Sequence, residues 1–532
     1  MNVDFIIHNA QIFTADATQP QAEAIAIKGH KILAVGSDDM VLATRTTNTR
    51  LLDAQQRTVM PGFIDSHFHL LLGSQELGDI LLYEATSFDD LVDQIREHAL
   101  THLHEPWLVG RGVYYSLLPD FTLTRRQLDA IVSDRPLVIF AYDAHTAWAN
   151  TEALRLAELL ENGQTVAPNS EIVQADDGFA HGELREPGAY NPIVDLLPPP
   201  SPAQMRRLLK AGLAELAQAG VTSVHNMDGD LAQLNLYVEL AQRGELTCRI
   251  YVPFDIKPDT PESAMSEAIA MQQLNYANLA RGGCVKFFMD GVIETYTGLL
   301  TEDYAGQSGN RGSGLFSLDH FSRMATLADK SGLQIFVHAV GDAAVRRTLD
   351  GFVRVEQTNG RRDSRHRVEH IELIHQADVS RFQSQGVIAS MQPAHAPLMD
   401  EGDPWSERIP QTRWNDAFAW QTLQQAGAKL ALGSDWPVMT YNPLVGVHRV
   451  VTRQPWADAL SDQRLSLHDT LIGYTRDAAY AEFQESVKGQ LKAGYLADLV
   501  LLSDDIFAVP PERIARIYPL LTMCDGRVVY ER

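Results

Sequence analysis

Apolar stretches of strand length recur along the middle of the chain, and amphipathic helical stretches lie between them. This alternation predicts parallel strands joined by crossover helices, because parallel strands need long connections. One helical stretch, "FSRMATLADKSG" (321–332), ends on a glycine, as helices commonly do. Eight stretches are candidate strands, which is the number that closes a TIM barrel. They are "FIDSHFHL" (63–70), "VTSVHNM" (221–227), "RIYVPFD" (249–255), "CVKFFMDG" (284–291), "QIFVHAVGD" (334–342), "RVEHIELI" (367–374), "VIASMQP" (387–393) and "KLALGSDWPV" (429–438).

The two ends of the chain resemble each other and differ from the middle. Both contain short β-rich pieces separated by turn residues, such as "ADLVLLSDD" (497–505) near the carboxyl end. We therefore expect residues 1–60 and 485–532 to pair into a composite β-sandwich domain. The barrel domain would occupy residues 61–484. The predicted fold class is α/β: a (β/α)8 TIM barrel, a small β-sandwich domain built from both chain ends, and a long insertion, residues 71–200, after the first barrel strand.

Composition limits the partners. The net charge of −24 and the pI near 5.1 argue against nucleic acid and against an anionic membrane surface, because both select basic proteins. Three widely spaced cysteines do not suggest a disulfide framework and fit a reducing compartment. The amino terminus lacks a leader pattern. We expect a cytoplasmic protein with a small-molecule substrate, and a homodimer is the default expectation for its oligomeric state.

Residues able to bind metal lie at the carboxyl ends of the candidate strands, where barrel enzymes place their chemistry. His67 and His69 are two positions apart in a strand, so their imidazoles point the same way and offer nitrogen ligands to a metal such as zinc. A single buried histidine is more often a hydrogen-bonded core residue. Packing alone, however, gives no reason to gather several titratable groups at one end of a barrel. The set is His67, His69, Lys286, His338, His370 and Asp435.

These motifs resemble the amidohydrolase superfamily: "PGFIDSHFH", a strand lysine, a histidine on each of the next two strands, and "GSD" on the last. "VKFFMDG", "VHAVGDAAV", "LGSDWPV", "AHTAWAN" and "YLADLVLLSDD" resemble its amidohydrolase-3 branch, which contains N-substituted formamide deformylase-like and YtcJ-like proteins. The resemblance implies two divalent metal ions, with zinc as the expected metal. His67 and His69 would bind the more buried ion, and His338 and His370 the more exposed one. Lys286 would be carboxylated and bridge the two ions.

The chemistry of these residue types agrees with that implication. Burial disfavours the charge of Lys286 and leaves an amine that can take up CO2, giving a carbamate that bridges the metals as an anion. Two metals can share one hydroxide and polarise a carbonyl, while Asp435, a metal ligand, serves as the catalytic base. The alternatives are a one-metal site with unmodified Lys286, a salt bridge from Lys286 to Asp290, and a turn role for Asp435. Asp65 either fixes a histidine ring or only shapes the strand end.

Four further residues are candidates for binding the substrate. His145 lies in the insertion, and the branch resemblance implies that it binds substrate or stabilises an oxyanion; local loop hydrogen bonding is the alternative. Tyr296, Gln392 and His395 follow the fourth and seventh strands and are candidates for lining the mouth of the barrel. His102 and His104 have metal-like spacing but lie away from any barrel strand, so a surface role is expected for them.

The predicted function is hydrolysis of a non-peptide carbon–nitrogen bond, in an amide or an N-substituted formamide-like substrate. One rival is a mononuclear deaminase, but deaminases of this superfamily typically carry a glutamate on the helix after the fifth strand, where this chain has Asp342. Ester or carbamate hydrolysis on the same barrel is a second alternative. A catalytically silent regulatory or binding protein is a third.

Overall fold

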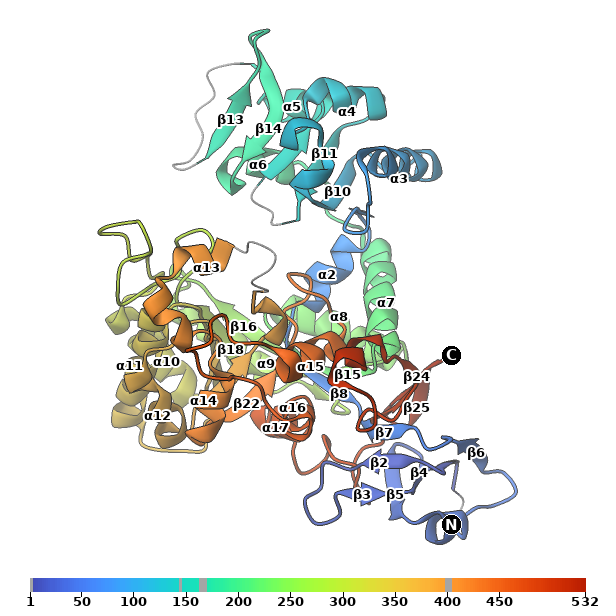
Figure 1. Cartoon of the computed structure of the whole chain (residues 1–532). Coiled ribbons are helices and arrows are strands. Elements are labelled where there is room, and N and C mark those ends of the chain that lie inside the picture. Colours follow the sequence, from blue (N-terminus) through green and yellow to red (C-terminus); the bar gives the residue numbers. More distant parts are fainter. Residues whose placement is uncertain (1–2, 143–145, 162–169, 398–403) are drawn as a thin grey trace. The chain divides into compact units, whose positions relative to one another are not determined.

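The computed structural model of the chain describes residues 3–142, 146–161, 170–397 and 404–532. These residues form two compact units. Leu71–Gly212 make one unit, and the described residues before and after that segment make the other. Figure 1 shows the elements of both units along the chain.

The larger unit contains a barrel of eight parallel strands, as expected from the sequence. Consecutive strands in the chain are neighbours in the barrel, with only the short β17 (Asn275–Tyr276) lying off this path. The last strand returns to the first through a parallel bridge between Trp436 and Phe68. The strands are β8 (Phe63–Phe68), β15 (Val221–Asn226), β16 (Arg249–Ile256), β18 (Ala280–Phe288), β19 (Gln334–Ala339), β20 (Arg367–His370), β21 (Ile388–Met391) and β22 (Lys429–Leu432).

Helices connect the barrel strands (Figure 1). The Ser317 side chain accepts a hydrogen bond from the His320 amide at the start of α10, and Gly332, with φ of 80°, follows the end of that helix. The buried face of α10 recurs with helical spacing at Phe321, Met324 and Ala328. The helices are α8 (Leu231–Gln242), α9 (Met265–Gln272), α10 (Leu318–Lys330), α11 (Asp342–Asn359), α12 (Gln376–Gln385), α13 (Pro404–Arg408), α14 (Trp420–Gln425), α15 (Pro443–Thr452), α16 (Leu467–Gly473) and α17 (Arg476–Ala481).

The larger unit also contains two smaller sheets, one of which joins both ends of the chain. Its six strands run in the order β25-β24-β23-β7-β2-β3, so strands from the carboxyl end lie beside strands from the amino end. A four-stranded sheet, β5-β4-β1-β6, comes from the amino end alone. The bounds are β1 (Phe5–His8), β2 (Gln11–Phe13), β3 (Gln21–Ala22), β4 (Ala24–Lys28), β5 (Lys31–Gly36), α1 (Asp38–Leu42), β6 (Arg50–Asp53), β7 (Thr58–Pro61), β23 (Leu499–Leu502), β24 (Pro519–Cys524) and β25 (Arg527–Glu531).

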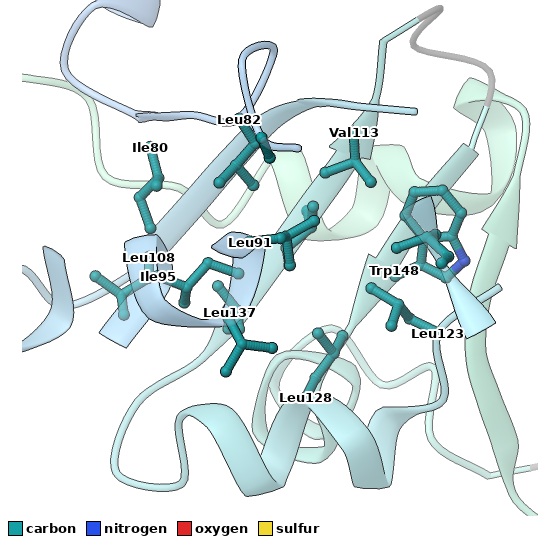
Figure 2. Close-up of a cluster of buried hydrophobic side chains, with 14 of the residues drawn as sticks. Ile80, Leu82, Leu91, Ile95, Leu108, Val113, Leu123, Leu128, Leu137 and Trp148 are labelled. Atoms are coloured by element: carbon teal, nitrogen blue, oxygen red, sulfur yellow. The ribbon is translucent and has the colours of Figure 1, made fainter. Parts of the chain in front are cut away.

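The smaller unit has its own sheet and core. Its strands run in the order β13-β14-β12-β11-β10-β9. Figure 2 shows a cluster of apolar side chains from α3, from β10 and β11 and from the segments between them, with Trp148 of β12 at one side of it. The bounds are α2 (Leu70–Glu76), β9 (Ile80–Leu81), α3 (Phe88–Thr101), β10 (Leu108–Val113), α4 (Arg125–Ile131), β11 (Leu137–Ala141), β12 (Thr146–Ala149), α5 (Thr151–Leu156), β13 (Glu171–Gln174), β14 (Ala180–Arg185), α6 (Pro187–Val194) and α7 (Pro202–Gln218).

The described helices include none that is both long enough and apolar enough to cross a membrane.

Candidate metal centre

Two sequence motifs meet where the first and last barrel strands close. The amide of Asp435 donates to the carbonyl of His67 at 2.7 Å, and the amide of His69 donates to the carbonyl of Trp436 at 2.9 Å. A Cβ atom at Gly433 would lie 2.5 Å from the His67 nitrogen, so only glycine fits this approach. The end of β8 and the turn after β22 are therefore fixed to each other by their backbones.

Asp65 takes part in this closure through backbone contacts. Its Oδ1 accepts from the amide of His67 at 3.1 Å and from the amide of Ser434 at 2.9 Å. Of the two roles considered from the sequence, shaping the strand end is the one that these contacts support. Asp435, which follows Ser434, has φ of 64°, and His370 has φ of 72°. Both residues occupy the left-handed region that non-glycine residues rarely adopt, which is typical of functional sites.

The side chains of His67, His370 and Asp435 converge at this end of the barrel. Each offers one ligand atom, and the three atoms lie within 4.8 Å of one another. The imidazole Nε2 atoms of His67 and His69 lie 3.4 Å and 3.2 Å from Oδ1 of Asp435. Residues from the first, sixth and last barrel strands thus point at one small region, as the sequence predicted for these four.

His338 and Lys286 lie next to this cluster. The imidazole centroid of His338 is 4.4 Å from that of His370, and its Nε2 is 3.1 Å from the carbonyl oxygen of Gly291. The ring centroid of Phe288 lies 5.0 Å from that of His338 and 4.9 Å from Nζ of Lys286. The six ligand candidates therefore occupy one neighbourhood, although His338 is turned toward a backbone carbonyl.

The surroundings of Lys286 disfavour a charged amine. Its side chain is 1% exposed, and among the described residues its Nζ finds no hydrogen-bond partner. Burial lowers the pKa of Lys286, and the negative charges of Glu369 and Asp435 oppose that shift without cancelling it. Asp290 is not its partner, because that carboxylate accepts from the backbone amides of Leu299, Val340 and Gly341.

Two carboxylates that the sequence reasoning missed orient the paired histidines. Oε2 of Glu369, on β20, lies 2.8 Å from Nδ1 of His67. Oδ1 of Asp228, just after β15, lies 2.9 Å from Nδ1 of His69. Since an ionised carboxylate only accepts hydrogen bonds, each Nδ1 carries a proton, and each ring is oriented with its Nε2 toward Asp435.

The protonation preferences also fit a cation. Burial holds the pKa of His67 and of His370 well below the ordinary value, so both are neutral, as metal ligands must be. Burial opposes the charge of His69 too, but the neighbouring carboxylates of Asp228 and Asp435 outweigh it and raise its pKa to about 9. Burial would raise the pKa of Asp435, yet the neighbouring His69 lowers it. The cluster thus favours positive charge beside an ionised Asp435.

Unpartnered polar atoms give an independent test of the fit to a metal. Within the described residues, Nζ of Lys286, both ring nitrogens of His370 and Oδ1 of Asp435 are buried without a hydrogen-bond partner. Buried polar atoms are normally paired, and leaving one unpaired costs roughly 1–3 kcal/mol. Nitrogen and oxygen donors gathered in this way suit zinc or a similar divalent ion. The residues present therefore fit the metal.

Of the four candidate substrate-binding residues, the structure describes three. His145 lies outside the described residues. Tyr296 packs its ring against Tyr304, with centroids 5.1 Å apart, and under the guanidinium of Arg408. Gln392 is 2% exposed, and neither atom of its amide has a partner.

His395 reaches the centre itself. Its Nδ1 lies 3.1 Å from Oε1 of Glu372, and its Nε2 lies 3.4 Å from Oδ2 of Asp435. His225 is wholly buried in the barrel, with Nδ1 2.7 Å from Nη1 of Arg367. Arg367 also donates a hydrogen bond from Nη2 to Oε2 of Glu369 at 3.1 Å, and its Nε forms an ion pair with Oε1 at 2.9 Å. His225 thus belongs to the polar network that supports Glu369.

Three comparisons place this chain among known proteins. The chain is 28% identical to Protein LONG AFTER FAR-RED 3 of Arabidopsis thaliana, over 94% of this chain and 87% of that one. It is 24% identical to the N-substituted formamide deformylase of Arthrobacter pascens, over 99% of this chain and 98% of that one. Its fold matches the crystal structure of an uncharacterised metal-dependent hydrolase from Pyrococcus furiosus, with a TM-score of 0.76 and 23% sequence identity. The match covers 96% of this chain and 99% of that one.

A family model confirms the resemblance found in the sequence motifs. The model described as the amidohydrolase family, Amidohydro_3, matches residues 50–530, which is most of the chain. This protein belongs to the amidohydrolase family.

Proposed function

We propose that this protein is a metal-dependent hydrolase that cleaves a non-peptide carbon–nitrogen bond in a small molecule, such as an amide or an N-substituted formamide. The observation that carries the proposal is the convergence of His67, His370 and Asp435 within 4.8 Å, beside a buried and unpartnered Lys286 amine. Membership of the amidohydrolase family and the deformylase relative support the choice of bond.

In this proposal the six sequence-predicted residues hold two divalent ions, with zinc as the favoured metal. The lowered pKa of Lys286 supports its carboxylation, because only a neutral amine adds CO2. The carbamate would give the centre a bridging anion in place of an unpaired amine. When bound, the metal pair activates a water molecule as nucleophile and polarises the carbonyl that is attacked. The ligands are His67, His69, Lys286, His338, His370 and Asp435.

The chain's own residues would move the proton and orient the substrate. Asp435 is ionised, so its carboxylate takes the proton from the attacking water and returns it to the departing amine nitrogen. Gln392 offers a buried carbonyl oxygen and an amide NH2 without partners, which suits the hydrogen-bonding pattern of an amide. His395 lies beside Asp435 and is oriented by Glu372, so it would keep that carboxylate in place.

The acid at the start of the helix after the fifth strand is not free to serve the deaminase alternative. Asp342 begins α11 there, but it accepts hydrogen bonds from the Thr301 amide at 2.9 Å and from Nη2 of Arg413 at 2.9 Å. Its carboxylate is 0% exposed and is committed to these contacts. A carboxylate held in this way is poorly suited to shuttle protons to a substrate.

The test is metal content together with a substrate screen. Protein grown with bicarbonate and purified without chelator or added metal is measured by elemental analysis and screened on formamides and N-acyl compounds. Transition metal in the barrel centre and turnover of such compounds are expected. Metal-replete protein that deaminates ring nitrogens but releases no acid from amides would overturn the proposed bond, and failure to bind zinc would overturn the hydrolase.

A further inference from the structure

A second group of metal-binding side chains lies in the smaller unit. His98, His102 and Glu105 each offer a ligand atom, and the three atoms lie within 4.8 Å of one another. His98 stands in the last turn of α3, His102 caps that helix, and Glu105 follows in the next turn of chain. These residues take no part in the barrel centre or in the proposed hydrolysis.

Helical spacing aligns the two imidazoles. Residues four apart lie on the same side of a helix, and the rings of His98 and His102 stack with centroids 3.9 Å apart and planes 9° from parallel. The pair continues the stripe of Leu91 and Ile95, whose side chains point into the apolar core drawn in Figure 2. Packing of that stripe fixes α3, and with it the place of both rings.

Hydrogen bonds indicate where the two imidazoles carry their protons. Nδ1 of His102 lies 3.1 Å from the carbonyl oxygen of His98, which can only accept, so Nδ1 carries the proton. The Nε2 atom of His102 is then the unprotonated nitrogen, in the form that binds a metal. Nε2 of His98 lies 3.0 Å from Oε2 of Glu105, so it donates to that carboxylate, and binding of a metal would release this proton. Two ligand atoms on a tetrahedral zinc stand about 3.3 Å apart, given bond lengths near 2.0–2.1 Å, so this separation is already close to the one that zinc needs.

The turn that carries Glu105 is held from the neighbouring segment. Nη1 of Arg135 donates to the carbonyls of His102 at 2.7 Å and Glu105 at 3.3 Å, and its Nη2 donates to that of Ala99 at 2.7 Å. The charge of Asp79 also reaches this cluster, and Asp79 is paired with Nε of Arg111 at 2.6 Å. The three ligands are therefore oriented without help from Asp79.

We propose that His98, His102 and Glu105 form an accessory binding site for zinc or a similar divalent transition metal. Two imidazoles and a carboxylate suit zinc, copper and nickel rather than magnesium or calcium. The His98 side chain is 17% exposed and that of Glu105 is 32% exposed, so an ion can enter from solvent and retain a water ligand. The bound ion ties the end of α3 to the chain that follows it, and so stabilises the smaller unit.

The test counts zinc in matched variants of the full-length protein. Chelator-treated wild type is dialysed against buffered zinc and compared with His98→Ala/His102→Ala, with the barrel double variant His67→Ala/His370→Ala, and with His104→Ala. His104 is an exposed histidine close to the cluster that belongs to no described metal group, so its removal controls for the loss of a surface imidazole.

The cluster variant is expected to bind one zinc fewer per chain than wild type and to keep the activity of wild type. The barrel variant is expected to keep one zinc per chain. The variant that combines the barrel and cluster substitutions is expected to lose that zinc. Zinc should raise the Tm of the barrel variant, and that rise should disappear in the combined variant. His104→Ala should match wild type. Equal zinc binding by the cluster variant and wild type, or the same loss in His104→Ala, would overturn the site, as would the absence of zinc from a folded barrel variant.

Discussion

Replacing Glu369 by glutamine tests how the orientation of one proposed metal ligand, His67, is controlled. Glu369 is 0% exposed, with Oε2 2.8 Å from Nδ1 of His67 and Oε1 2.9 Å from Nε of Arg367. Oε2 also accepts a hydrogen bond from Nη2 of Arg367 at 3.1 Å, while Oε1 forms an ion pair with Nε of Arg367, and the carboxylate fixes the proton of His67 on Nδ1. An amide offers one accepting oxygen, so in Glu369→Gln an NH2 group must face either His67 or Arg367. Either the His67 ring or the Arg367 guanidinium then loses its charged hydrogen-bond partner.

The magnitude follows from the kind of hydrogen bond that is lost. A hydrogen bond to a charged group contributes roughly 1.5–3 kcal/mol, and each 1.4 kcal/mol is tenfold in affinity. Zinc binding should therefore weaken by about 10- to 100-fold, in line with the usual effect of removing a carboxylate behind a metal-bound histidine. Asp228→Asn makes the same chemical change behind His69. The Asp228 side chain is 30% exposed, so water replaces part of its contact and the loss should be under about tenfold.

The assay is competition for zinc against a chromophoric chelator, with chelator-treated proteins at constant pH. Because Glu369→Gln also weakens the pairing of buried Arg367, the Tm of each variant is measured beside it. Glu369→Asp keeps a negative charge near Arg367, but its shorter side chain no longer reaches His67. This variant should therefore lose zinc affinity with a smaller fall in Tm than Glu369→Gln. Zinc affinities of Glu369→Gln and Glu369→Asp equal to wild type, or a larger loss in Asp228→Asn, would refute this reasoning.

Three further predictions follow from the same structure. Lys286→Ala should lose most activity, with partial recovery on adding short carboxylic acids that enter the gap; steady-state rates with and without acetate decide it, and wild-type turnover without acid would contradict it. Asp435→Asn should lower kcat by about 100-fold or more while elemental analysis finds most of the metal retained, and an unchanged kcat would exclude the proton role. Asp329 is buried, which raises its pKa, but hydrogen bonds with His366 and Asn359 lower the pKa to about 2. Its ionised form therefore stabilises the fold above about pH 4, and that stability is lost toward pH 2; in urea unfolding, Asp329→Asn should be less stable by roughly 1–2 kcal/mol at pH 7 and equal to wild type near pH 2.

The barrel could be predicted because its determinants are local. Barrel strands such as β19 (QIFVHA) are largely apolar, and helices between them repeat apolar residues at helical spacing, as Phe321 and Met324 do in α10. Once eight parallel strands are expected, the residues at their carboxyl ends must lie near one another. This is why His67, His370 and Asp435 could be expected to converge from positions far apart in the chain.

The carboxylates behind the histidines could not be predicted, because they depend on register between strands. Glu369 precedes His370 in "RVEH" and reaches His67 across 302 residues of sequence. Asp228 reaches His69 across 159 residues. Asp65 is the carboxylate nearest to the histidines in sequence, yet its neighbours in space are backbone amides. The detectable signal was the acidic Glu369 inside a barrel strand, because an acid that is buried there needs a partner.

The pairs His67/His69 and His102/His104 have the same spacing in sequence, but the secondary structure that carries each pair decides whether its two imidazoles lie together. In β8, alternation of side chains brings His67 and His69 to the same face, and both Nε2 atoms approach Asp435. His102 has the same spacing to His104, but it caps a helix, so its ring stacks on His98, four residues earlier. A pattern of two imidazoles therefore indicates a metal only together with the element that carries it. In the helix, the imidazole that lies beside His102 is that of His98, one turn away. The metal site proposed in the smaller unit therefore uses His98 and not His104.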